Sequence, residues 1–187
     1  MKKKLYMLGL ILALAFTAVG CGKKKGSDDS ATATDSAEIK ADLLEFVNTE
    51  LPAIEADREK AVGIYNAYFT SEDIDLEQYL NDLQTVAIPA METYVTNLTA
   101  IEVSSDDVDN LKSLYLQYAN KQLEAMKLVT KAISEQNADY LDQADECITE
   151  SKALIAQYND ELLKLAKANE IDVEGATPTD ATSTDAE

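Results

Sequence analysis

Between residues 36 and 172, apolar side chains recur at alternating steps of three and four residues. This spacing places them along one face of an α-helix, as in helices that pack through a single stripe. Residues that punctuate turns are rare in this stretch, where Gly63, Pro52 and Pro89 are the only glycine and prolines. The pattern therefore predicts an all-α domain over residues 36–172.

Four stripes can be distinguished, and two of them are interrupted by a polar residue. Arg58 interrupts the first stripe and Gln122 the third. The fourth keeps heptad spacing, which predicts shallow helix crossing and places Ile148, Ile155 and Leu162 in the core. The stripes run from Ile39 to Tyr68, from Leu76 to Ile101, from Val108 to Ile133 and from Leu141 to Leu165.

Each expected helix is preceded by a residue suited to capping its first turn. Ser36, Ser71, Ser105 and Asn137 have side chains that accept hydrogen bonds from free helix amides. The connections between the helices are only a few residues long, so sequential helices are expected to be antiparallel neighbours. The predicted architecture is an up-down-up-down four-helix bundle with long helices.

Two prolines fall near the middles of the first two helices. Pro52 and Pro89 each lack an amide donor, and each ring crowds the carbonyl group four residues earlier. We therefore expect both helices to be kinked at these positions. Two interpretations stay open: the kinks open a pocket between the helices, or packing accommodates the curvature.

The first 20 residues have the order of a secretory signal. Three lysines follow Met1, and an apolar run then extends from Leu5 to Val19. This run is shorter than the roughly 20 apolar residues that a membrane-spanning helix needs. We expect residues 1–20 to be removed as a signal peptide, which leaves no transmembrane helix.

The string Ala18-Val19-Gly20-Cys21 resembles the bacterial lipobox, although Leu is usual where this chain has Ala18. The resemblance implies lipidation of Cys21, with a diacyl group on sulfur, and a mature chain that begins at this residue. Two acyl chains hold a protein firmly on a membrane. The chain thus resembles cell-surface lipoproteins with a helical-bundle ectodomain, tethered to the outer face of the bacterial cell membrane. A plain signal peptide with an incidental cysteine is the alternative.

The segments that flank the bundle are small and polar. Residues 21–35 and 173–187 are rich in Ser, Thr, Ala and Asp and cannot bury a core. We expect a flexible linker after the lipidated cysteine and a disordered acidic tail at the other end.

Acidic residues dominate the charge of the chain. The net charge is −19, and loss of residues 1–20 removes three lysines and no acid, giving −22. Nucleic acid is excluded as a partner because a phosphate backbone needs a basic patch. The acidity attracts cations or basic proteins, or it simply keeps the surface solvated.

The chain contains no histidine, which removes most catalytic and metal chemistry. Ser-His-Asp and Cys-His catalysis are excluded, and so are di-iron sites built on Glu-x-x-His. Cys147 is the only thiol left once Cys21 is acylated, and we expect it to be a buried core residue. No enzyme activity and no cofactor are therefore expected.

Carboxylates gather near the expected helix starts without forming a recognisable metal site. Asp73, Asp75 and Glu77 alternate as in a calcium loop, but the turn glycine and the glutamate at the twelfth position are missing. We expect no bound metal and interpret these groups as solvated acids at helix N-termini.

Eight tyrosines remain after processing, and all fall on the expected helices. A tyrosine ring packs inside while its hydroxyl group seeks a partner, so positions at the edge of the core are expected. The alternative is a groove for a sugar, peptide or aromatic ligand, formed by Tyr65, Tyr68, Tyr115 and Tyr118. The function expected from the sequence is a membrane-anchored, non-catalytic interaction or ligand-binding module for a protein or small molecule. A purely structural envelope protein is the alternative, and a carboxylate-based enzyme ranks below both.

Overall fold

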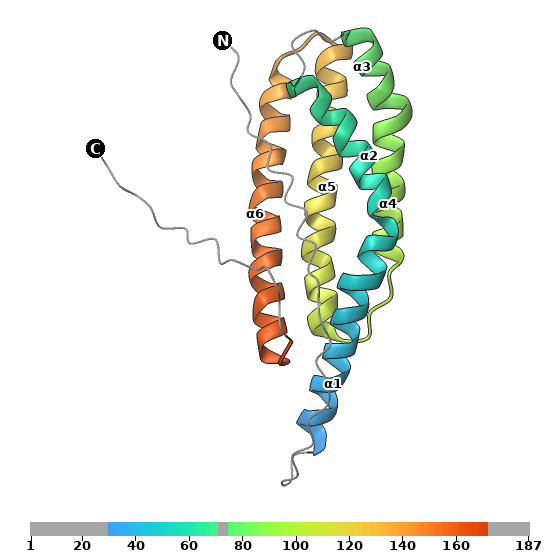
Figure 1. Cartoon of the computed structure of the whole chain (residues 1–187). Helices are drawn as coiled ribbons and strands as arrows, with labels where there is room; N and C mark the ends of the chain where they lie inside the picture. Colours follow the sequence, from blue (N-terminus) through green and yellow to red (C-terminus); the bar gives the residue numbers. More distant parts are fainter. Residues whose placement is uncertain (1–29, 71–74, 172–187) are drawn as a thin grey trace, which may run out of the picture.

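The computed structural model describes residues 30–70 and 75–171, and every regular element in these residues is helical (Figure 1). The predicted all-α class is confirmed for this part of the chain, and the helices form a bundle. The first two helical runs each contain one π-helical turn. The elements are α1 (Ser30–Glu45), η1 (Phe46–Glu50), α2 (Leu51–Thr70), α3 (Leu76–Asp82), η2 (Leu83–Ala87), α4 (Ile88–Ala100), α5 (Asp106–Ser134) and α6 (Asp139–Ala168).

Helix α1 begins earlier than the sequence predicted. Its first residue is Ser30, whereas the predicted start was at Ser36 and residues 21–35 were assigned to a linker. Residues 30–35 contain two alanines and neither Gly nor Pro, so nothing in this segment stops the helix from extending. The predicted signal peptide, Cys21 and the predicted tail over residues 173–187 lie outside the described residues.

A π-helical turn precedes each of the two helix-interior prolines. The amide of Leu51 donates a hydrogen bond to the carbonyl of Phe46. The amide of Ile88 donates one to the carbonyl of Leu83. These bonds span one residue more than an α-helical bond. The next residue in each case is the proline, which has no amide to donate and needs room for its ring. Both helical runs therefore continue through their prolines.

The N-cap agrees with the sequence at one of the four helix starts, that of α5. Ser105 Oγ accepts a hydrogen bond at 3.3 Å from the amide three residues on. At α6 the N-cap is Ala138, and the predicted cap, Asn137, instead accepts a hydrogen bond of 3.0 Å at Oδ1 from the amide two residues on. At α3 the cap is Asp75, whose carboxylate accepts two amide hydrogen bonds. The predicted cap at this point, Ser71, lies outside the described residues.

Among the described helices, α5 and α6 share the most extensive contact and lie side by side (Figure 1). Smaller contacts join α2 to α4 and α4 to α5, whereas α2 and α6 approach each other little. Small side chains let helix axes come close, and both long helices bury several of them. These residues are Ala119, Ala125 and Ala132 on α5, and Ala144, Ser151 and Ala166 on α6.

The buried face of α6 departs from the predicted heptad register. Leu162 is buried as predicted, but Ile148 and Ile155 are only half-buried and pack at the edge of the core. Ala144, Cys147, Ser151 and Tyr158 are the buried residues around them, so the buried face is centred beside the two isoleucines rather than on them.

Candidate functional site

The two polar residues that interrupt the apolar stripes meet inside the bundle. Arg58 on α2 donates from Nη1 to Tyr118 Oη at 2.9 Å and to Gln122 Oε1 at 3.4 Å, both on α5. Gln122 Nε2 donates to the same tyrosine oxygen at 3.1 Å. The interruptions are therefore one polar contact between two helices.

Arg58 is also paired with Glu55, one turn earlier on α2. Its Nε and Nη2 atoms lie 2.7 and 2.6 Å from a single carboxylate oxygen, Glu55 Oε1. The other oxygen accepts a hydrogen bond from Tyr94 Oη at 3.4 Å. The exposed fractions of the Arg58 and Glu55 side chains are 12% and 21%. This ion pair is largely withdrawn from water, which costs desolvation energy.

Tyrosine rings surround the ion pair. The Arg58 guanidinium carbon lies 5.6 Å from the centroid of the Tyr118 ring, within the range of a cation–π interaction. The Tyr115 ring is tilted against Tyr118, with centroids 5.4 Å apart, and against Tyr158 on α6 at 4.7 Å. We call the following residues the polar cluster: Glu55, Arg58, Tyr94, Tyr115, Tyr118 and Gln122.

Burial and neighbouring groups fix the charges of the cluster. Burial raises the pKa of Tyr115 to about 12 and raises those of Tyr94 and Tyr118. Burial alone would lower the pKa of Arg58, but Tyr118 and the hydrogen bond to Glu55 raise it above its ordinary value. Arg58 therefore stays charged and these tyrosines stay neutral in the physiological range. The cluster offers a fixed cation and hydrogen-bond donors rather than a tyrosine or arginine that exchanges protons.

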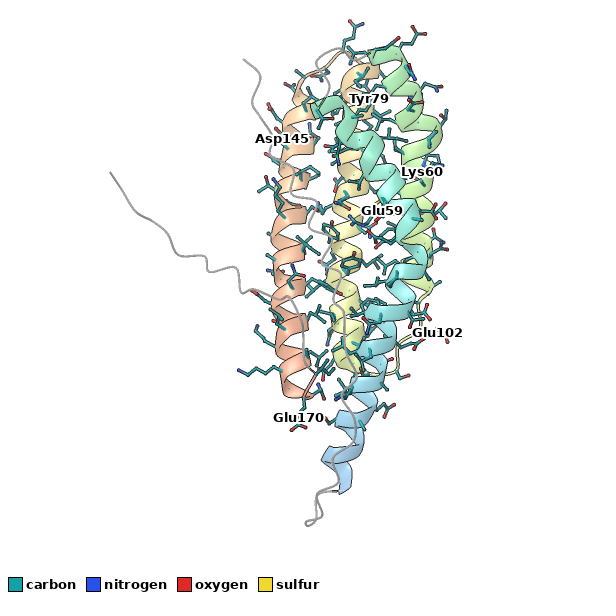
Figure 2. The ribbon with its side chains drawn as sticks, in the orientation of Figure 1. Glu59, Lys60, Tyr79, Glu102, Asp145 and Glu170 are labelled. Atoms are coloured by element: carbon teal, nitrogen blue, oxygen red, sulfur yellow. The ribbon has the colours of Figure 1, made fainter. Side chains whose placement is uncertain are left out.

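Of the four tyrosines in the predicted groove, Tyr115 and Tyr118 are in contact with each other. The backbone carbonyl of Tyr65 accepts a hydrogen bond from Tyr79 Oη at 2.9 Å. Burial raises the pKa of Tyr65, and Asp145 on α6 adds to the effect. Tyr79 and Asp145 both lie toward the end of the molecule where α6 begins (Figure 2). The side chain of Tyr68 lies outside the described residues.

No site was predicted from the sequence at Glu55, Arg58, Tyr94 or Gln122. The available signal was the pair of interruptions at Arg58 and Gln122. A long charged or amide side chain at a core position is unusual unless it is paired. Both positions lie on stripes that face the core of the bundle, and the structure shows that their side chains meet.

Cys147 and the acidic groups do not extend this site. The thiol is buried, and burial together with Glu124 raises the pKa of Cys147. Asp75, one of the acids suggestive of a calcium loop, caps α3, while Asp73 lies outside the described residues. Within residues 30–70 and 75–171, no group of three or more Cys, Asp or Glu side chains could hold a metal ion.

A shallow groove of about 410 Å³ runs along α5, away from the cluster. Its lysines have partners of their own, since Lys127 Nζ lies 2.6 Å from Glu92 Oε1 and Lys131 lies over the Tyr140 ring. The groove is lined by Asn120, Leu123, Glu124, Lys127, Leu128 and Lys131. It contains no buried unpaired charge to select a ligand.

In the part of the chain that the structure describes, no helix has the length and apolar character needed to cross a membrane. The chain matches no protein-family model, no curated protein and no solved structure.

Proposed function

We propose that this chain is a lipid-anchored surface protein of a bacterial cell envelope, whose bundle is a non-catalytic interaction or ligand-binding module. The proposed location follows from the signal-like residues 1–20 and from the lipobox-like string that ends at Cys21. The proposed binding role rests on one observation, the polar cluster around Arg58.

The energetics of buried ion pairs support a role beyond stability. Replacing such a pair by apolar side chains of similar volume is often neutral, or stabilising by about 1–4 kcal/mol, because the desolvation cost disappears. The half-buried Arg58–Glu55 pair lies in a bundle whose buried residues are nearly all apolar. A bundle that needed only stability would be served better by apolar residues here, whereas a binding module needs polar groups.

The finer architecture is part of the proposal. We propose an up-down-up-down arrangement of four long helices for the domain over residues 36–172, with bends at Pro52 and Pro89. The short connection between α5 and α6 and the extensive contact between these helices support antiparallel neighbours. The π-helical turns before both prolines support local distortion of the first two helical runs.

The anchor is tested by replacing the lipidated residue. Cys21→Ala should abolish incorporation of labelled palmitate, and the protein should appear in the medium or remain as an uncleaved precursor. Cys147→Ala is the matched control because it removes the other cysteine and leaves the lipobox-like string intact. Retention of a processed Cys21→Ala protein on membranes would contradict lipid anchoring.

The binding role is tested by cross-linking on intact cells, followed by purification of the tagged full-length protein. Wild type and a Lys60→Gln control should capture the same partner, since Lys60 is exposed on α2. Arg58→Gln should lose it. Equal capture by all three proteins would separate binding from the cluster. Capture of no partner by any of them would favour the alternative, a purely structural envelope protein.

A further inference from the structure

We propose that the Nε and Nη2 edge of the Arg58 guanidinium group is a binding site for the carboxylate group of a ligand. In the structure the Glu55 carboxylate occupies this site in place of the ligand. This inference deepens the proposed function and rests on it, since it names the chemistry that the binding module would recognise. It follows from three features of the cluster: the geometry of the ion pair, the exposure of its two members and the way each is held.

The ion pair has a geometry that a free carboxylate could improve. Arg58 Nε and Nη2 both donate hydrogen bonds to Glu55 Oε1. A single carboxylate oxygen therefore accepts both hydrogen bonds from this edge of the guanidinium group. The second oxygen faces Tyr94 Oη at 3.4 Å instead. Arginine binds carboxylates best through two parallel hydrogen bonds to two oxygens. A free carboxylate, not tied to the same helix three residues away, can present both.

Glu55 is the outer and less restrained member of the pair. Its side chain is 21% exposed against 12% for Arg58. Arg58 is also fixed to α5 by hydrogen bonds to Tyr118 and Gln122. Glu55 can therefore rotate into water while the guanidinium group stays in place. Its hydration in the rotated position offsets part of the lost ion-pair energy.

An exchange of one carboxylate for another conserves the chemistry of the cluster. Arg58 keeps a negative partner, and Tyr94 Oη keeps an acceptor. A cationic ligand would instead have to displace Arg58, which would break its contacts with Tyr118 and Gln122. The site thus favours a carboxylate despite the acidity of the chain. A small organic acid, an acidic peptide side chain and a peptide C-terminus all supply this group.

Arg58 provides a direct probe because it is the only arginine in the sequence. Its side-chain Nε–Hε group gives one assignable signal in a ¹⁵N-correlated NMR spectrum of the full chain. Sodium acetate is titrated against sodium chloride at equal ionic strength. The Arg58 signal should shift saturably with acetate and not with chloride.

Removing the internal competitor should strengthen binding. Glu55→Gln should bind acetate about tenfold more tightly than wild type if Glu55 occupies the edge about nine-tenths of the time. Glu55→Ala serves as a second variant, with no amide to replace the carboxylate. Glu59→Gln is the matched control, because Glu59 is an exposed acid on the same helix and its loss changes the net charge equally (Figure 2).

The outcomes separate this inference from the wider proposal. No saturable shift of the Arg58 signal in either Glu55 variant, or equal gains in Glu55→Gln and Glu59→Gln, would overturn the carboxylate site. If cells still yielded a partner that depends on Arg58, the binding role would stand without it. Saturable acetate binding with no captured partner would retain the site and remove the protein-interaction role. Acetyl-glutamate amide and acetyl-glycine, titrated in parallel, distinguish a peptide side chain from a C-terminal carboxylate.

Discussion

Two regions of the bundle are built on opposite principles. Helices α5 and α6 are in extensive contact, and α6 buries Ala144, Ser151, Leu162 and Ala166. Where α2 faces α5, Arg58 contacts both Glu55 and Gln122 beside large tyrosine rings. The first region gains its energy from removing apolar surface from water. In the second region, withdrawing charged groups from water costs free energy. This cost indicates a role other than stability.

The largest effect is expected from the apolar region. Leu162→Ala removes a side chain that is only 1% exposed and should lower the free energy of unfolding by about 2–5 kcal/mol. Urea denaturation followed by circular dichroism measures the change. Asp160→Ala, an exposed position on the same helix, should change it by no more than about 0.5 kcal/mol. Equal small losses in both variants would show that the α5–α6 contact is not a tight core.

Alkaline pH should act on the polar region. Tyr115 has a pKa of about 12 in the folded chain, above the ordinary value near 10 that an unfolded chain would show. Stability from this group is therefore complete below about pH 10 and is lost as the pH rises from 10 toward 12. Tyrosinate absorbance at 295 nm and circular dichroism should change together over this range. Full ionisation of the tyrosines by pH 10.5 with the helices intact would contradict the buried cluster.

Breaking the ion pair alone should be costly. Arg58→Met leaves the Glu55 carboxylate without its partner and should lower the free energy of unfolding by about 1–3 kcal/mol. The loss is smaller than for a fully buried pair because Glu55 can turn toward water. Urea denaturation provides the measurement, with Lys60→Met as the exposed control on α2. An Arg58→Met variant as stable as wild type would show that Glu55 is already solvated.

A smaller change, of opposite sign, is expected on the outer face of α2. Gly63 is exposed, and a Cβ added there would meet no atom within 4 Å. Gly63→Ala should therefore raise the free energy of unfolding by about 0.5–1 kcal/mol, because glycine loses more backbone entropy in a helix. A thermal melt detects the gain. A loss of stability would show that something else packs on this face of α2.

The helices were predictable because periodicity is a local property. The three-and-four spacing predicted all-helical structure, and Ser105 predicted the start of α5. The π-helical turns were not predicted, since the expected response to Pro52 and Pro89 was a kink rather than one additional residue in a turn. The early start at Ser30 was missed because a stretch rich in Ser, Thr and Asp is also typical of linkers.

The site was harder to predict than the fold because it depends on how helices pair. Tyr115 and Tyr118 were identified from one helix, where their spacing brings them together. Tyr65 was grouped with them, and the structure shows its backbone carbonyl accepting a hydrogen bond from Tyr79 Oη. Arg58 and Gln122 stood out as interruptions, but the alignment of α2 against α5 decides that they meet. Packing across the bundle sets that alignment. The pattern along a single helix carries no information about it.

The central claim is that the polar cluster serves recognition and is dispensable for stability. The most direct test is the free energy of unfolding of the double variant Glu55→Leu with Arg58→Met, measured in urea beside wild type and Arg58→Met. Apolar replacement of both partners removes the desolvation cost together with the attraction. We predict that the double variant matches wild type to within about 1 kcal/mol and recovers the stability lost in Arg58→Met. A double variant at least as unstable as Arg58→Met would show that the ion pair holds the bundle together, and would contradict the claim.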